Sequence, residues 1–185
     1  MKIPSLLLTI SAMALTDAPA LAGNYSFNGD TTGGLTFNRP TDAGDALSLI
    51  GTEVPHLWLS FTVSQSGSYN LSLNAVDPGS YDTFMHLYSG SFNPSSPLDN
   101  FFAANDDAPG GSAFGSALTG VSLTAGNSYV FVLDGFGNTD FGAFNASISG
   151  LGDISINSVP EPSVLSLGGF AGIGLLMFRQ RLARR

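Results

Sequence analysis

The sequence contains no cysteine and only two histidines, His56 and His86, and each shortage excludes a class of function. Without thiols there are neither disulfide bonds nor thiolate metal sites, so a fold in an oxidising compartment depends on core packing and, as a further support, on divalent cations. Two isolated histidines without cysteine give no usable zinc-site spacing. The absence of cysteine also excludes catalysis by a thiol.

Basic residues are almost absent from the central part of the chain. Between residues 23 and 158 one basic residue, Arg39, faces twelve acidic ones, a formal charge of −11. Because nucleic-acid binding depends on arginine and lysine contacts to phosphates, nucleic acid is excluded as a partner.

Catalytic patterns are missing as well. No Gly-x-Ser-x-Gly motif is present, and Asp82 lies four residues before His86, roughly 13 Å along a strand at ~3.3 Å per residue, too far for a direct dyad. Asp106 and Asp107 are adjacent and would point to opposite faces of a strand, which does not suit a glycosidase pair. The sequence therefore predicts a protein that is not an enzyme, with His86 as a satisfied or surface histidine.

The amino terminus has the layout of a secretory signal peptide. Met1-Lys2 supplies a positive start, residues 3–15 are apolar, and Ala20-Leu21-Ala22 forms a small-x-small site before Gly23. We expect signal peptidase to remove residues 1–22. The alternative is an amino-terminal membrane anchor, for which the apolar run is short.

The carboxyl terminus combines three elements. Val159, Pro160, Glu161 and Pro162 precede an uncharged apolar stretch at 163–178, and four arginines follow it: Arg179, Arg181, Arg184 and Arg185. As a helix the stretch spans roughly 24 Å, and its arginines favour the cytoplasmic side. This order resembles the PEP-CTERM sorting signal. The resemblance implies a transient inner-membrane anchor that the membrane enzyme exosortase recognises and removes.

Residues 23–152, between these signals, are predicted to form one exported domain, with 153–158 as a linker. Short alternating runs separated by turns predict an all-β fold, a single antiparallel β-sandwich of about eight strands. The runs 57–63 and 69–75 predict a hairpin with one buried face. Residues 29–53 are predicted to be an acidic, turn-rich and partly disordered segment. Further strands are predicted at 25–27, 35–37, 83–89, 101–104, 117–123, 128–134 and 141–149.

The middle of the chain carries a family resemblance. Residues 81–88 (YDTFMHLY), Asn105-Asp106-Asp107 and residues 116–132 resemble the bacterial pre-peptidase C-terminal domain over about residues 57–149. The resemblance implies a jelly-roll-like β-sandwich, accessory to secreted proteases and other exported proteins, some of which bind calcium or polymeric substrates. It supports the fold far more than an activity, and no catalytic residue is carried over.

Acidic side chains gather at the ends of predicted strands. Asn105, Asp106 and Asp107 follow the strand 101–104, Asp82 precedes 83–89, and Asp134 ends 128–134. Hard cations prefer such oxygen ligands, so these five residues are a candidate calcium site, which Asp140 could also join. The spacing is not that of an EF-hand loop. The alternative is that these residues only form turns and solubilise the domain.

Aromatic residues are numerous and allow two interpretations: most fill the core of a cysteine-free domain, or some are exposed and stack on sugar rings. We predict an exported, exosortase-sorted cell-surface or extracellular-matrix protein whose β-sandwich is a non-catalytic binding or structural module. Its expected partners are signal peptidase, an exosortase-type enzyme and extracellular polysaccharide or matrix. The alternative is an accessory module or small hydrolase acting on an extracellular polymer.

Overall fold

The computed structural model describes residues 22–110 and 114–158, and this part of the chain is all-β. Within it, no helix is long and apolar enough to cross a membrane. Residues 1–21 of the predicted signal peptide, including Ala20, lie outside the described residues. The same is true of the whole predicted sorting signal, residues 159–185, with its helix at 163–178.

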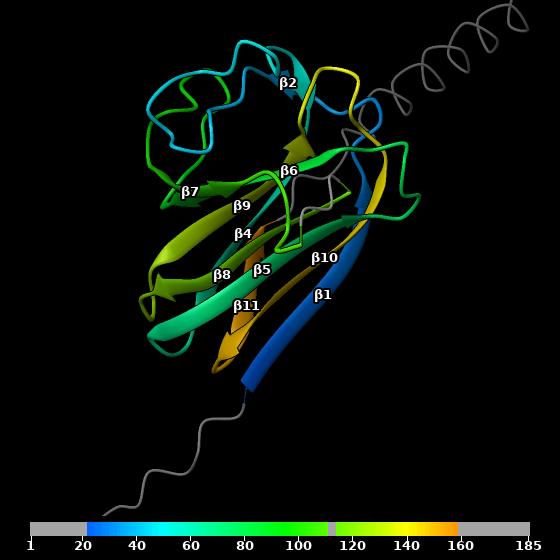
Figure 1. The fold of residues 1–185 in the computed structure, drawn as a ribbon. Helices are drawn as coiled ribbons and strands as arrows, with labels where there is room; N and C mark the ends of the chain where they lie inside the picture. Colours follow the sequence, from blue (N-terminus) through cyan, green and yellow to red (C-terminus); the bar gives the residue numbers. More distant parts are fainter. Residues whose placement is uncertain (1–21, 111–113, 159–185) are drawn as a thin grey trace, which may run out of the picture.

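Nine strands form two antiparallel sheets (Figure 1). The first sheet has the order β1 (Ala22–Asp30), β10 (Ala143–Leu151), β5 (Gly67–Ala75), β8 (Gly115–Leu123). The second has the order β11 (Ile154–Ser158), β4 (Leu57–Val63), β9 (Ser128–Gly135), β6 (Thr83–Ser89), β7 (Phe101–Asn105). Two short strands, β2 (Thr36–Phe37) and β3 (Val54–Pro55), pair separately. Without β11, the strand order is that of a jelly roll.

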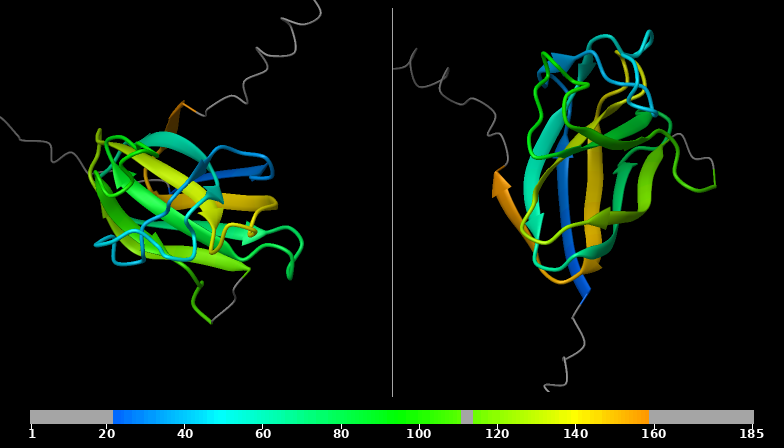
Figure 2. Two further views of the ribbon diagram at one scale, coloured as in Figure 1. Left: turned by 90° about the horizontal axis from the view of Figure 1, so that it is seen from above. Right: turned by 90° about the vertical axis from the view of Figure 1, so that its left-hand side faces the viewer.

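The main core lies between the two sheets (Figure 2). The core forms because apolar and polar residues alternate along the strands. In β5, Tyr69, Leu71 and Leu73 are buried, while the polar residues between them face outward. Leu59 and Phe61 of β4 do the same from the opposite sheet. The prediction of an antiparallel β-sandwich is therefore confirmed. Most aromatic rings pack inside, as the core interpretation predicted: the largest fully buried side chains include Tyr69, Tyr81, Tyr88, Phe61, Phe84, Phe131 and Phe144.

The predicted hairpin of 57–63 and 69–75 is wrong, because its two strands belong to different sheets. β4 pairs with β9 and β11, whereas β5 pairs with β10 and β8. The short connection crosses from one sheet to the other. Alternating burial specifies that each strand has one buried face, but it does not specify which strand lies beside it. The strand predicted at 35–37 is likewise not part of the sandwich; its β2 pairs only with β3.

The predicted linker at 153–158 contains a strand of the sandwich. Gly152 adopts a φ of 75°, a left-handed conformation that favours glycine, and β11 follows it into the second sheet. Ile154 pairs with Val63, and Ile154 and Ile156 pack against the main core. The folded unit therefore extends to Ser158 rather than ending at residue 152.

Residues 31–56, called here the covering segment, pack over the outer face of the second sheet together with the β6–β7 connection. Phe37 and Val54 form a second buried cluster with Tyr88, Val130 and Val132 of the sheet. The two connections lie together at one end of the sandwich in Figure 1. The expectation of partial disorder in 29–53 is thus wrong, because Phe37, Arg39 and Pro40 of this acidic segment are buried against the rest of the domain.

Candidate metal centre

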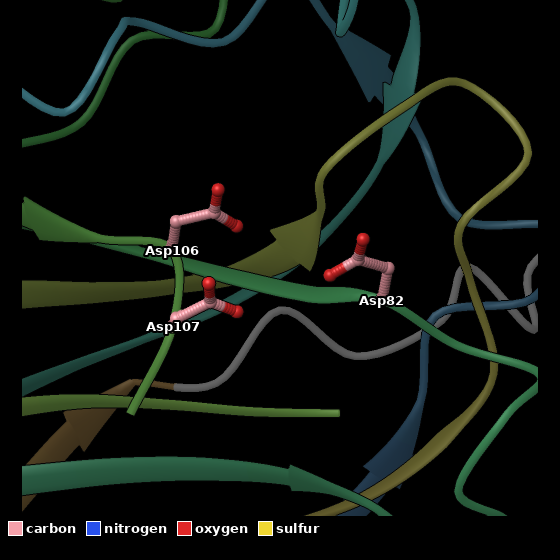
Figure 3. A group of neighbouring side chains, drawn as sticks. All are labelled: Asp82, Asp106 and Asp107. Carbon is pink, nitrogen blue, oxygen red and sulfur yellow. The ribbon is translucent and has the colours of Figure 1, made fainter. Parts of the chain in front are cut away.

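Three of the predicted calcium ligands converge at one end of the β6–β7 pair. Met85 of β6 pairs with Asn105 of β7, so Asp82, which precedes β6, lies beside Asp106 and Asp107, which follow β7. One carboxylate oxygen from each of the three aspartates lies within 4.8 Å of the others. Figure 3 shows the carboxyl groups of Asp106 and Asp107 turned toward Asp82.

Backbone contacts hold both sides of the group. The carbonyl oxygen of Asp82 accepts a hydrogen bond from the Phe136 amide at 3.0 Å, just after β9. After Asp107, the Ala108 amide donates to the Gly115 carbonyl oxygen at 2.6 Å. The three carboxylates are therefore placed by the ends of two different strands, β6 and β7, rather than by one flexible loop.

The spacing of the oxygens fits a calcium ion. With Ca–O distances of about 2.3–2.6 Å, two ligands on opposite sides of one ion are about 5 Å apart, whereas Mg–O distances of about 2.0–2.1 Å allow only about 4 Å. In addition, Oδ1 of Asp82 and Oδ1 of Asp106 are buried and have no hydrogen-bond partner within residues 22–110 and 114–158. Buried carboxylate oxygens without a partner are costly, and a cation would satisfy them.

The electrostatic environment of the three aspartates favours binding of a cation. Burial raises the pKa of Asp82 to about 6, with Asp140 and Asp107 adding to the effect. Burial also raises the pKa of Asp106 to about 6, assisted by Asp82, Asp107 and Asp42. Arg39 opposes both shifts, but its guanidinium donates its hydrogen bonds to the carbonyl oxygens of Phe136 and Pro40. The carboxylates therefore repel one another without a direct basic partner.

These raised pKa values predict a pH effect on stability in the presence of a chelator. A carboxyl whose folded-state pKa is about 6, above the ordinary 3.8, contributes stability that is present at low pH and lost as pH rises through 6. The double variant Asp82→Asn/Asp106→Asn should therefore melt at a higher temperature than the wild type at pH 7.5. At pH 5 the difference should shrink, because the wild-type carboxyls are then largely protonated.

The difference in melting temperature between the wild type and the double variant reports only on the carboxyl groups of Asp82 and Asp106. Burial lowers the pKa of His56, so this histidine destabilises the fold as pH falls, in the opposite direction. His56 is present in both proteins, and its contribution cancels in the difference between their melting temperatures. A difference that is the same at pH 5 and pH 7.5 would contradict the raised pKa values.

Two predicted ligands lie elsewhere, which corrects the candidate site. The Asn105 side-chain oxygen accepts a hydrogen bond from the Ala117 amide at 2.8 Å and so ties β7 to β8. Asp134 is fully buried on the outer face of the second sheet, beneath the covering segment. Asp140 also stays outside the group, because its Oδ2 accepts from the Gly137 amide at 2.8 Å.

Asp134 belongs instead to a buried polar cluster that sequence reasoning missed. Its Oδ2 lies 3.1 Å from Nδ1 of His86, and both side chains are inaccessible to solvent. Nε2 of His86 lies 3.3 Å from the Pro40 carbonyl oxygen. Arg39, only 3% exposed, stacks its guanidinium 3.9 Å from the Phe84 ring centroid.

One signal in the sequence pointed to this cluster. Arg39 is the single lysine or arginine between residues 23 and 158, and a lone basic residue among twelve acidic ones is a candidate for a structural ion-pairing role. His86 lies near Asp134 because β6 and β9 are neighbours in the sheet, with Phe84 opposite Asp134. That contact could be predicted only from the order of the strands in the sheet.

Comparisons with known proteins give structural likenesses only. No protein-family model matches the chain, and no curated protein matches it. The K3 cleaved adhesin domain of Lys-gingipain from Porphyromonas gingivalis W83 has a TM-score of 0.34 at 18% identity, with 70% of this chain and 91% of that chain covered. The K1 cleaved adhesin domain of the same protein has a TM-score of 0.35 at 14% identity, with 75% and 99% covered. The Yersinia pseudotuberculosis-derived mitogen has a TM-score of 0.34 at 10% identity, with 78% and 92% covered.

Proposed function

We propose that this protein is an exported, exosortase-sorted component of the cell surface or extracellular matrix, whose β-sandwich is a non-catalytic binding or structural module. The observation that carries the non-catalytic part is the position of the histidines. His86 is completely buried, His56 is 4% exposed, and both pack against the ring of Phe37 in the covering segment. A general base must reach its substrate, and these two are enclosed by aromatic side chains.

The alternative of a small hydrolase required an open cleft at His86 with carboxylates around it. The carboxylate beside His86 is Asp134, which is equally buried, and the ring of Phe84 stacks on the imidazole at 4.8 Å between centroids. The carboxylates of Asp82, Asp106 and Asp107, of which two are half-buried and one is exposed, form a separate group without a histidine. This arrangement favours a cation site over hydrolysis.

We propose calcium as the ion that Asp82, Asp106 and Asp107 bind. The three side chains would supply oxygen ligands, and water or backbone carbonyls would complete the six to eight that calcium takes. Bound there, the ion would neutralise the repulsion among these aspartates and link the start of β6 to the chain that leaves β7. Its role would be structural.

Sorting is testable on the mature protein. If exosortase removes the tail, mass spectrometry of the surface or secreted protein should find a new carboxyl end near Val159 or Pro160, and an amino terminus at Gly23. Replacing Arg179, Arg181, Arg184 and Arg185 with glutamine should weaken the cytoplasmic stop and reduce the processed form.

The same measurement can reject the sorting proposal. Recovery of peptides that contain Leu175–Arg185 from the mature surface protein would contradict removal of the tail. The matched control is Arg39→Gln, which also removes a positive charge but lies in the covering segment, far from the tail in the sequence. Any of this variant that reaches the surface should be processed at the same position as the wild type.

A further inference from the structure

The outward face of the first sheet carries side chains of only two chemical types in its central rows. The register of β1, β10 and β5 aligns asparagines in one row across the three strands and serines in the next: Asn28, Asn145 and Asn74, then Ser26, Ser147 and Ser72. A third row, Asn24, Ser149 and Asn70, continues the pattern. The face is therefore an ordered array of amides and hydroxyls, which donate and accept hydrogen bonds without charge.

A hollow coincides with this array. Its volume is about 420 Å³, and it is lined by the same asparagine and serine rows together with Phe27 and Ala146. Small-molecule sites in proteins are commonly about 300–1,000 Å³. The floor is pre-organised, because the hydroxyls of Ser72 and Ser147 are hydrogen-bonded to each other at 2.8 Å. Asn28, Asn74 and Asn145, which line the hollow, are exposed to solvent.

The scarcity of charged residues and of exposed aromatic residues on the first sheet limits the kinds of partner that this face could bind. The four strands of this sheet contain one charged residue, Asp30 at the end of β1, although the protein is strongly acidic. An acidic polymer would be repelled by the rest of the molecule, and a basic one would be drawn to the acidic loops rather than to this face. The centres of protein–protein interfaces are enriched in aromatic side chains, and none of the aromatic residues of these strands is exposed.

We propose that the Asn/Ser face of β1, β10 and β5 binds a neutral polysaccharide. Sugar hydroxyls both donate and accept hydrogen bonds, and each row offers amides or hydroxyls at the spacing of neighbouring strands, about 4.8 Å. An uncharged polymer does not suffer repulsion from the acidic loops. This inference rests on the proposed role as an exported surface or matrix module, and it names both the binding face and the ligand class.

The test uses purified full-length protein and defined polymers. Retention is measured by co-sedimentation with insoluble cellulose and amylose and by affinity electrophoresis in soluble dextran, with alginate as the acidic comparison. We expect retention on at least one neutral polymer. The variant Asn74→Ala/Asn145→Ala, which removes two exposed amides, should bind about tenfold more weakly, as expected for the loss of one or two hydrogen bonds.

Two controls separate binding from folding. Asn127→Ala changes the same residue type at an exposed position in the turn before β9 and should bind like the wild type. Asn28→Ala, on the edge strand β1, tests the asparagine row independently if the double variant is destabilised. Unchanged melting temperatures confirm that the variants are folded.

Four outcomes would overturn the inference: no retention on any neutral polymer, retention on alginate alone, equal retention by wild type and double variant, or a dimer in sedimentation that the double variant dissociates. The last would assign the face to a second copy of the chain. Tail processing and the calcium response test the proposed function separately. If both persist while polymer binding fails, only the polysaccharide inference is rejected.

Discussion

Calcium is expected to raise the melting temperature of the full-length protein on the order of 10 °C at a hundredfold excess over Kd. An ion that binds only the folded state adds RT ln(1 + [L]/Kd), about 2.7 kcal/mol at that excess, and each kcal/mol moves the midpoint of a domain of this size by about 4 °C. The effect should be specific, because calcium takes six to eight oxygen ligands in a flexible geometry, whereas magnesium requires a near-ideal octahedron and keeps several of its waters.

The measurement is a thermal melt with chelator, with millimolar calcium, and with magnesium at matched ionic strength. Asp82→Asn or Asp106→Asn should abolish most of the calcium shift, because each removes a carboxylate whose buried Oδ1 has no partner among the described residues. Asp45→Asn is the matched control; Asp45 is exposed and accepts a hydrogen bond from the Thr41 hydroxyl. It should keep the full shift.

Several outcomes would argue against the calcium site. Equal midpoints with calcium, magnesium and chelator would reject binding. A shift of the same size in all variants, or one that magnesium reproduces, would indicate general screening of the negative charge instead.

Arg39→Met is expected to lower the free energy of unfolding by about 3–5 kcal/mol. The change removes three hydrogen bonds, to the Phe136 and Pro40 carbonyl oxygens at 2.8–3.0 Å. It also leaves Asp134 buried without the positive charge that lies near it. Breaking a buried charge cluster from one side is costly, because the remaining charge keeps its desolvation penalty.

Urea unfolding in chelator, monitored by circular dichroism, measures this change. Arg39→Lys should fall between Arg39→Met and the wild type, since lysine keeps the charge but cannot donate to the Phe136 carbonyl from two nitrogens at once. Asp45→Asn should again remain close to the wild type. Wild-type stability in Arg39→Met would show that the covering segment is held by its apolar contacts alone.

The local pattern of the chain was sufficient to predict the positions of most strands. The runs 57–63 and 83–89 coincide with β4 and β6, because both are bounded by clear turn residues. At the edge of the second sheet, the sequence pattern that marks a strand is weaker. The run at 154–158 is short and follows a glycine turn, so it was assigned to a linker although it forms β11.

The candidate site was only partly predictable for a related reason. Oxygen-bearing side chains at strand ends were visible in the sequence, and Asp82, Asp106 and Asp107 do meet. Asp134 also ends a strand, but its side chain lies on the outer face of the second sheet, which the covering segment buries. The order of the strands in each sheet decides which strand ends lie close together, and this order cannot be predicted from a local sequence pattern.

By itself the sequence determined the chemical limits of this protein: no thiol chemistry, a strongly acidic surface and strands with one buried face. These follow from composition and from the two-residue period of a strand. The tertiary structure alone decided that β4 and β5 lie in opposite sheets, that His86 meets the buried Asp134, and that the asparagines of three separated strands form one row. These are contacts between distant segments, and pairing and core packing select them together for the whole chain.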